Sequence, residues 1–420
     1  MASFLVSRWQ GIVLGQIDVF LIRHEEEFDL ERSTPLAEAH HAWVTAQIDR
    51  RSQAQLEPIE LEYLPWGPPL ASTGELCDMV ASFGEGPLEY AAMRKGCAIL
   101  DGSRRGTLEL RGEDRLDFLD RMVTNLVKDL RPGQSRDAFF LTRKGRIESD
   151  LGLLVLEDRI LIDLDIHNAP STTAALDAFI IVDDVALTDI SDQMHHISLF
   201  GPKSIHTLEL ASGEQALGMD SGAVRPLNIG NGSVIARRQD LTGEVGFELL
   251  VERDHAATVY NALLATDEDP EPGKRTVRPV GWHAFNIARV ESGLPIFNID
   301  FGVTNLPHET GLLEQRVSFQ KGCYPGQEIV ARMQNLGKPK QQMVILQIHG
   351  DQLPLAGAAV VRSNQEESAQ IGVVTSSVLS PLNSLKPRAL AMLRTAAIEE
   401  DRACGVVADG GIVSAEVQDL

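Results

Sequence analysis

The most distinctive stretch of the sequence runs from residue 319 to residue 328 and reads FQKGCYPGQE. Two glycines and a proline within six residues predict a tight turn whose backbone can approach a ligand closely. Lys321 precedes Cys323 by two positions, and a nearby cation can lower the pKa of a thiol and keep part of it as thiolate. Taken alone, the stretch fits either a reactive cysteine on a turn or a connecting loop with an incidental cysteine.

The composition of the 420-residue chain is that of a globular protein with acidic character. Hydrophobic residues make up 43% and charged residues 23%, so there is enough apolar surface to form a core. The length fits two to four domains of about 100–200 residues each. The formal net charge is −22. Because binding to duplex nucleic acid depends on many cations facing phosphates, we expect no such partner.

The cysteines and the hydropathy pattern predict a protein of a reducing, cytoplasmic compartment. The four cysteines stand at least twenty positions apart, without a CxxC pair or a zinc spacing. The apolar run from Gly11 to Ile22 is interrupted by Gln16 and Asp18, and no cleavage site follows it. No stretch approaches the roughly 20 apolar residues of a membrane span, so we expect no membrane contact.

The pattern along the chain changes twice. The first seventy-odd residues are acidic around Glu25–Glu27, and a helix is expected to begin after Thr34. From Leu76 onward, short strands alternate with helices, which favours an α/β or α+β fold. After Gly337, β-branched runs are separated by Gly, Pro, Asn and Ser, which predicts a small β-barrel or sandwich.

Several common catalytic motifs are missing from the sequence. GxGxxG, GxxxxGK[ST], HExxH and GxSxG do not occur, which argues against the usual nucleotide loops, zinc proteolysis and serine hydrolysis. The histidine pairs at 40–41 and 195–196 are adjacent, so their side chains diverge in a helix or a strand. We therefore predict no metal site.

The stretch from 319 to 328 resembles the signature of the YgfZ-type folate-binding proteins, which reads K-G-C-aromatic-x-G-Q-E. These proteins are relatives of the glycine-cleavage T-protein, an aminomethyltransferase. Other segments resemble that superfamily in the same order, from about Leu76 to Arg394. They are Leu100–Ser103, Phe118–Leu119 with Thr124–Asn125, Pro132–Gln134, Lys144–Asp150, Thr242–Glu248, Arg289–Gly293, Gly372–Ser376 and Ser380–Pro381.

The resemblance implies an α+β fold in the form of a three-part cloverleaf around an opening that receives tetrahydrofolate or a one-carbon derivative of it. Residues 1–75 would form an N-terminal extension of unknown role. Residues 76–335 would form the folate-binding region, with two mixed α/β subdomains, and residues 336–420 the C-terminal β-barrel.

The resemblance also implies which residues bind the folate. Glu244 would accept the N–H and the exocyclic NH₂ of the pterin edge, since one carboxylate can accept both. Arg289 would bind the anionic benzoylglutamate tail through its planar fork. The window 321–340 carries a net charge of +3 and could attract a polyglutamate tail, or could be a solvated loop. Further expected cofactor-binding residues are Asn125, Tyr324, Gln327 and Glu328.

Three residues are predicted to carry chemistry. Cys323 would be the reactive thiol, with Lys321 lowering its pKa. Asp150 falls where the T-protein has its catalytic aspartate, which assists aminomethyl transfer through electrostatics or proton handling. Asp150 is preceded by Ser149 where T-proteins carry a second acid, and it could also merely end a strand.

The resemblance implies a tetrahydrofolate-binding protein of the YgfZ type, with a role in assembling or maintaining iron–sulfur clusters and in supporting tRNA-modifying enzymes. Its expected partners are folate and iron–sulfur client proteins. The alternative is a folate-dependent aminomethyl- or methyltransferase of the T-protein type. A scaffold with a vestigial folate opening is a third hypothesis. Whether the protein is an enzyme therefore stays open at this point.

Overall fold

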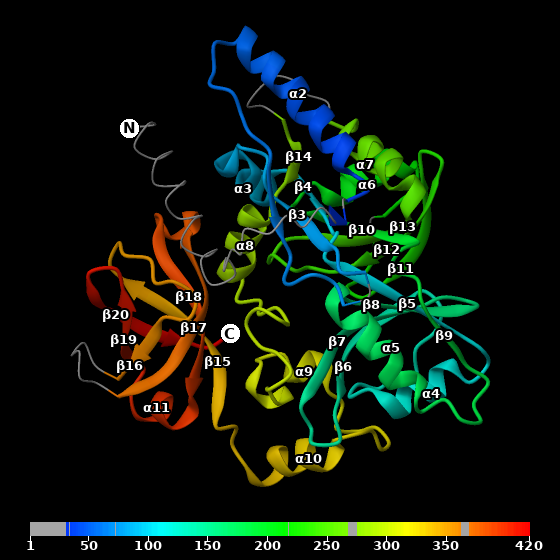
Figure 1. The fold of residues 1–420 in the computed structure, drawn as a ribbon, viewed down its shortest axis with the longest axis vertical. Coiled ribbons are helices and arrows are strands. Elements are labelled where there is room, and N and C mark those ends of the chain that lie inside the picture. The colour runs from blue at the N-terminus through cyan, green and yellow to red at the C-terminus, as the bar shows by residue number, and fades with distance from the viewer. Residues whose placement is uncertain (1–30, 33, 72, 217, 268–274, 363–368) are drawn as a thin grey trace.

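The computed structural model describes residues 31–420 except residues 33, 72, 217, 268–274 and 363–368. The apolar run from Gly11 to Ile22 and the acidic residues Glu25–Glu27 lie outside the described residues. Four β units and their helices build the described part of the chain (Figure 1).

The N-terminal extension forms one long helix and two strands, which pair with β3 of the following region in a three-stranded sheet. The sheet has the order β1-β3-β2, with β1 at Glu31–Arg32, β2 at Glu62–Pro65 and β3 at Leu76–Ser82. The helix expected after Thr34 is confirmed as α2, Ala37–Gln53. Its buried residue Trp43 belongs to the same core cluster as residues of the six-stranded sheet, so the extension packs onto the body of the protein.

The six-stranded sheet has the order β11-β12-β13-β10-β4-β14. Its strands are antiparallel except for β14, which pairs parallel with β4. Helices α6 and α7 contribute buried leucines to the core cluster of this sheet. The bounds are β4 Cys97–Asp101, β10 Met194–Phe200, β11 Val224–Ile229, β12 Gly232–Arg238, β13 Gly246–Glu252, β14 Val277–Val280, α6 Ser204–Ser212 and α7 Ala256–Leu264.

The five-stranded sheet is antiparallel throughout, in the order β6-β7-β8-β5-β9. Helices α4 and α5 cover one face, because Phe118 and Leu119 of α4 and Leu176 of α5 are buried with the sheet residues Leu108 and Ile162. The bounds are β5 Arg105–Arg111, β6 Gln134–Leu141, β7 Ile147–Val155, β8 Arg159–Asp165, β9 Ala186–Asp189, α4 Arg115–Met122 and α5 Ala169–Asp177.

The C-terminal strands close into a barrel of six, in the order β15-β18-β17-β16-β19-β20. The barrel, rather than a sandwich, is therefore the form that the β-rich pattern takes. Its interior is filled by small and branched side chains such as Val344, Leu346 and Ala391. The bounds are β15 Gln341–His349, β16 Ala359–Val361, β17 Gln370–Ser380, β18 Lys386–Arg394, β19 Ala403–Ala408, β20 Gly411–Gln418 and α11 Thr395–Glu400.

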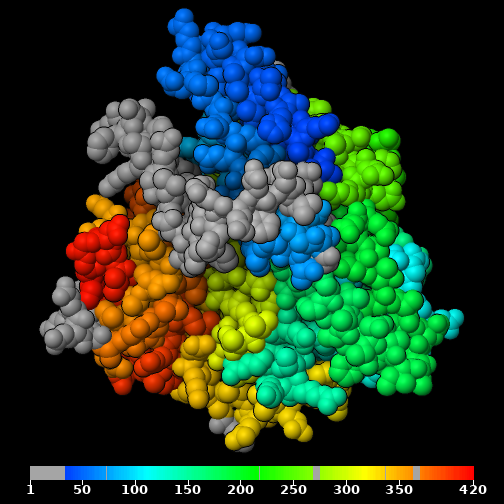
Figure 2. Space-filling model, in the orientation of Figure 1, coloured from blue at the N-terminus to red at the C-terminus, as the bar shows by residue number. Residues whose placement is uncertain are grey.

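The barrel and the two larger sheets surround helix α8, Trp282–Glu291, and the chain that follows it (Figure 1). This chain continues through α9, Leu313–Arg316, and α10, Gln327–Leu336. In Figure 2 it is visible in yellow between the orange barrel and the teal five-stranded sheet. One core cluster joins α8 with α3, Gly86–Lys95, and with the barrel. The α+β cloverleaf is confirmed.

We propose that the chain divides at residues 75/76 and 335/336, as the sequence suggests. The lower boundary falls just before β3, and the upper one falls within the last turn of α10, before the barrel strands begin. The extension shares its core with the six-stranded sheet, which supports the view that residues 31–75 need residues 76–335 in order to fold.

Candidate active site

A cavity lies where the five-stranded sheet, the six-stranded sheet and the chain after α8 meet. The empty space between its lining residues measures about 690 Å³, part of which is open solvent. Apolar side chains such as Leu241, Phe285 and Phe297 form part of the wall. The rest is densely charged, with four arginines and five carboxylates. These are Arg104, Arg105, Arg237, Arg316, Asp137, Asp150, Asp163, Asp165 and Glu248.

Asp150, on β7, is held in the wall by the arginine that ends α9. Arg316 Nε donates to Asp150 Oδ1 at 2.7 Å, and Arg316 Nη1 donates to Asp137 Oδ2 at 2.9 Å. Burial raises the pKa of the Asp150 carboxyl, and the guanidinium opposes that rise only in part. The prediction that Asp150 lies at a functional site gains geometric support, since a fixed carboxyl with a perturbed pKa in a cavity is a common arrangement in active sites.

Asp137 is the centre of a second contact across the cavity. It accepts a hydrogen bond from Arg237 of β12, so it links the two sheets. Burial acts to raise the pKa of Asp137, but Arg237 and Arg316 outweigh it and lower that pKa below its ordinary value. Gly152 leaves the room for this contact, because a Cβ at that position would lie 2.4 Å from Arg237 Nη1. Asp137 and Asp150 therefore share a cavity but differ in their affinity for a proton.

Glu248 is the remaining buried carboxylate that reaches the cavity from the six-stranded sheet. It lies inside β13 among apolar residues, and burial raises its pKa, with the Ser198 hydroxyl on the paired strand offsetting part of the rise. Among the residues that the structure describes, Glu248 makes no ion pair. Arg104 and Arg105 act on Glu248 through their charges without forming an ion pair, so its carboxylate oxygens can still accept hydrogen bonds from a ligand.

Glu244, the predicted pterin ligand, does not line the cavity. It lies in the turn before β13, its side chain is 32% exposed, and its carboxylate is 3.5 Å from Arg94 Nη1. The same motif does reach the cavity four residues later, through Glu248. The prediction that Glu244 binds the pterin is corrected, because the turn directs its side chain away from the cavity, toward α3.

Arg289, the predicted ligand of the folate tail, is completely buried in α8. Its Nη1 donates to Asp300 at 2.7 Å, its Nη2 to the Ser376 hydroxyl at 2.7 Å, and its Nε to Asn286 at 2.9 Å. These contacts join α8 to strand β17 of the barrel. Because protein acceptors bind these N–H groups, the prediction that Arg289 binds the folate tail is corrected. Arg289 instead links α8 to the barrel inside the protein.

The cysteine turn sits on the tip of the hairpin between β6 and β7. Gly326 has φ +79°, and a Cβ there would lie 2.6 Å from the Thr142 carbonyl oxygen and 2.8 Å from the Gly145 Cα. Tyr324 is buried in the central core cluster, while Cys323 is exposed. The cavity lining includes none of the four predicted residues of the turn, which are Cys323, Tyr324, Gln327 and Glu328.

Lys321 is not positioned to act on the thiol. Its side chain is fully buried, and its Nζ donates to the backbone oxygens of Asp120, Val123 and Asn125 at the C-terminal end of α4. All three N–H groups of the ammonium are thereby used. Burial lowers the pKa of Lys321 to about 8. The prediction that Lys321 lowers the pKa of the Cys323 thiol is therefore corrected. Lys321 instead caps the C-terminus of α4, where a cation is favourable.

Asn125 lies behind the cavity wall and not in it. Its side-chain amide donates to the backbone oxygens of Asp137 and Gln315 at 2.8 and 2.9 Å, and its Oδ1 accepts from the Leu126 N–H. Asn125 therefore holds α9 against β6, which positions Arg316. The prediction that it contacts the cofactor is corrected to this positioning role.

The glycines of the turn give a direct test of this packing. We expect Gly326→Ala to destabilise the protein by about 1–3 kcal/mol, because the residue adopts a left-handed conformation and its Cβ would meet backbone atoms. Gly322→Ala is the matched control, since no atom lies within 4 Å of its Cβ position. Urea unfolding of both variants checks this, and equal midpoints for the two would contradict it.

Sequence reasoning missed most of the charged wall. Asp137, Arg237, Glu248 and Arg316 come from four separate segments that only the fold brings together. One signal was available for Glu248: an acid inside the apolar run Phe247–Val251 is expected to be buried, and buried acids are rarely without a function or a partner. Nothing local marks Arg316 in the same way.

Neither a cluster of metal ligands nor a membrane-spanning helix is found in the described part of the chain. Within the described part of the chain, no three His, Cys, Asp or Glu side chains come together as ligands for a metal ion. None of the helices in that part is long and apolar enough to cross a membrane. The cytoplasmic location stays a prediction.

Comparisons with known proteins agree with this fold. Residues 84–321, more than half of the chain, match the model of the GCVT N-terminal domain. A protein of Geobacillus kaustophilus named aminomethyltransferase is 26% identical over 311 residues, which cover 72% of this chain and 81% of the relative. One of Halalkalibacterium halodurans with the same name is 28% identical over 296 residues, covering 70% and 78%.

A solved structure gives the same result for the fold. The crystal structure of glycine cleavage system aminomethyltransferase T from Bartonella henselae superposes with a TM-score of 0.75 at 21% identity, covering 92% of this chain and 96% of the other. At that identity the likeness shows the fold alone.

These findings correct the functional expectation. The YgfZ-type prediction is wrong, together with its iron–sulfur and tRNA roles and its client proteins. The relatives that contradict it are named aminomethyltransferase. They favour the alternative of a T-protein-like transferase. The chain belongs to the GCVT N-terminal domain family, within the T-protein superfamily.

Proposed function

We propose that the protein is a tetrahydrofolate-dependent aminomethyltransferase. The observation that carries the proposal is Asp150, a carboxylate whose side chain is 18% exposed and which Arg316 fixes at the wall of the cavity. The domain family and the names of the relatives support the same activity.

The lining of the cavity fits a reduced folate. Phe285, Phe297 and Leu241 offer apolar surface to a flat ring system. The Glu248 carboxylate can accept two hydrogen bonds side by side, which matches the N–H and NH₂ of a pterin edge. We therefore propose Glu248, in place of Glu244, as the group that recognises the pterin.

Bound tetrahydrofolate supplies the nucleophilic nitrogen that accepts the one-carbon unit. Asp150 contributes a negative charge at a fixed place, where it stabilises positive charge that develops on the transferred group as ammonia leaves. Arg316 holds the orientation of that carboxylate, and Asp137 holds the orientation of Arg316. Phe285 and Phe297 exclude water from one side, which strengthens these electrostatic contacts.

The pH dependence of the reaction is expected to follow Asp150. Burial raises the pKa of its carboxyl, so the ionised form is lost at a higher pH than for an ordinary aspartate, whose pKa is about 3.9. If the ionised form is needed, kcat falls with acidification, and the midpoint of the acid limb lies above that value. A kcat profile that stays flat down to pH 4 would contradict this.

The experiment that tests the proposal supplies purified protein with tetrahydrofolate and an aminomethyl group on a dihydrolipoyl carrier. The expected products are methylenetetrahydrofolate, ammonia and free dihydrolipoyl groups in equal amounts, because one C–S and one C–N bond break for each carbon transferred. Folate binding without transfer from this donor would overturn the proposal.

A further inference from the structure

Arg104 stands out among the charged residues of the cavity. It precedes β5, lines the cavity and is only 8% exposed. Its guanidinium lies 5.3 Å from the ring centre of Trp66, 5.7 Å from that of Trp282 and 5.9 Å from that of Phe285. Burial lowers the pKa of Arg104 to about 10, so the group still carries its charge at neutral pH.

The other three arginines of the cavity bind carboxylates of the protein. Arg105 binds Asp163, Arg237 binds Asp137, and Arg316 binds both Asp137 and Asp150. The guanidinium of Arg104, in contrast, makes no hydrogen bond and no ion pair with any described residue.

Stacking on aromatic rings does not satisfy these donors. A guanidinium presents its face to a ring, while its five N–H groups point outward in its plane. No nitrogen of Arg104 is among the fully buried polar atoms without a partner, so these donors keep access to the space of the cavity that Arg104 lines. The plane of Arg104 is therefore open to an acceptor that the described residues do not provide.

Asp165 acts on Arg104 through its charge, but its oxygens accept hydrogen bonds from other donors. Asp165 accepts from the Trp66 indole N–H at 3.0 Å through one oxygen and from the His167 backbone N–H at 3.0 Å through the other. The Trp66 carbonyl oxygen in turn accepts from His167 Nε2 at 2.6 Å. Trp66 thus fixes Asp165 on the side of His167, so Asp165 acts on Arg104 through its charge and makes no hydrogen bond or ion pair with the guanidinium.

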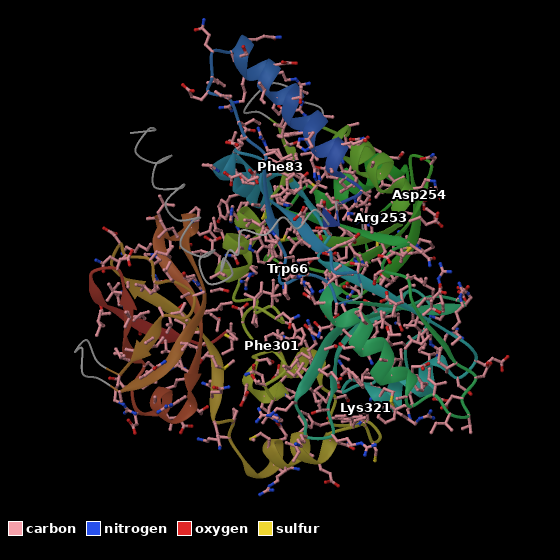
Figure 3. The ribbon with its side chains drawn as sticks, viewed as in Figure 1. Trp66, Phe83, Arg253, Asp254, Phe301 and Lys321 are labelled. Atoms are coloured by element: carbon pink, nitrogen blue, oxygen red, sulfur yellow. The ribbon has the colours of Figure 1, made fainter. Side chains whose placement is uncertain are left out.

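Trp66 comes from the N-terminal extension. It follows β2 and lies outside residues 84–321, which match the family model. Figure 3 shows Trp66 near the centre of the molecule, above Phe301 and far from Lys321. Through this side chain the extension contacts two residues that line the cavity, Arg104 and Asp165.

We propose that Arg104 binds a carboxylate of the ligand that enters the cavity, and that Trp66 is a positioning residue for that contact. The inference rests on the proposed function and deepens it, because it assigns an anionic group to the ligand. The carboxylate has two possible sources, the glutamate tail of the folate or a one-carbon donor that is itself an amino acid. A planar fork suits either source, since it binds a carboxylate through two parallel hydrogen bonds.

The first arm of the test compares tetrahydrofolate with 6-methyltetrahydropterin, which lacks the tail. If the tail is the source, Arg104→Met weakens tetrahydrofolate binding about 10- to 100-fold and leaves pterin binding unchanged. Arg121→Met on the exposed side of α4 is the matched control, and it should bind both ligands like wild type.

The second arm measures the melting temperature with glycine or N-methylglycine. If the donor is the source, these carboxylates stabilise wild type and not Arg104→Met, while tetrahydrofolate binds both equally. This arm works even if wild type binds no folate, so failure of the proposed function and failure of this inference are distinguishable. Equal behaviour of Arg104→Met and wild type in both arms would overturn the inference.

Two further variants separate a binding role from a structural one. Arg104→Lys keeps the charge but loses the fork, so it should bind the responding ligand with an intermediate Kd even if the methionine variant does not fold. Trp66→Leu should raise KM for that ligand with little change in kcat, and Trp66→Phe, which keeps a ring face, should recover part of the loss. An unchanged KM in a folded Trp66→Leu variant would remove Trp66 from the proposal.

Discussion

Asp150→Asn is expected to lower kcat for aminomethyl transfer by about 100- to 10,000-fold. The amide keeps the size and one acceptor of the carboxylate but carries no negative charge at the wall of the cavity. Arg316 still binds Asp137 in the variant, so the cavity keeps its shape and KM for tetrahydrofolate should change little. Steady-state kinetics with a saturating donor measure the effect.

Asp158→Asn is the matched control for this substitution. Asp158 is 60% exposed, pairs with Arg111 at the surface and does not line the cavity, so its amide variant should turn over like wild type. If Asp150→Asn keeps its rate within about threefold of wild type while remaining folded, the carboxylate has no part in the chemistry.

Arg289→Met is expected to cost about 3–5 kcal/mol of stability. The variant leaves the fully buried Asp300 without its cation. It also removes the hydrogen bond that Ser376 of the barrel accepts from Arg289. The two hydroxyl hydrogen bonds to Asp300, from Thr375 and Ser376, remain and do not neutralise its charge. The urea midpoint of the full-length protein reports the loss.

Two comparisons make this prediction specific. Replacing both members of the pair, Arg289→Met with Asp300→Leu, should recover part of the loss, because no uncompensated charge then stays buried. Arg402→Met breaks an ion pair to Asp419 at the surface and should leave the midpoint near that of wild type. A midpoint for Arg289→Met as high as that of Arg402→Met would show that the buried link contributes nothing.

The sequence predicted the fold better than the site. The β-branched runs after Gly337 predicted a barrel or a sandwich from local periodicity, and the resemblance to the T-protein superfamily implied the cloverleaf. The resemblance also implied a role for Asp150, which lines the cavity, and that role stays a prediction. These features depend on residues that are close together in the chain.

The side-chain environments were harder to predict because they depend on tertiary contacts. Arg289 was assigned to a ligand, but its neighbours from Ala284 to Val290 are all buried, so α8 has no solvated face there for it to reach. Glu244 and Glu248 belong to one motif, and only the direction of β13 decides which enters the cavity. Lys321 precedes the cysteine in sequence, yet its ammonium is drawn to the carbonyl groups at the end of α4.

The most direct test of a folate site in this cavity is the Kd of tetrahydrofolate for wild type and for Glu248→Gln, measured by titration calorimetry. Glutamine keeps the shape of the side chain but offers one acceptor oxygen and no charge to the pterin edge. We expect wild type to bind and Glu248→Gln to bind at least about tenfold more weakly, with Glu244→Gln close to wild type. Equal affinities for wild type and Glu248→Gln, or a loss confined to Glu244→Gln, would contradict this site.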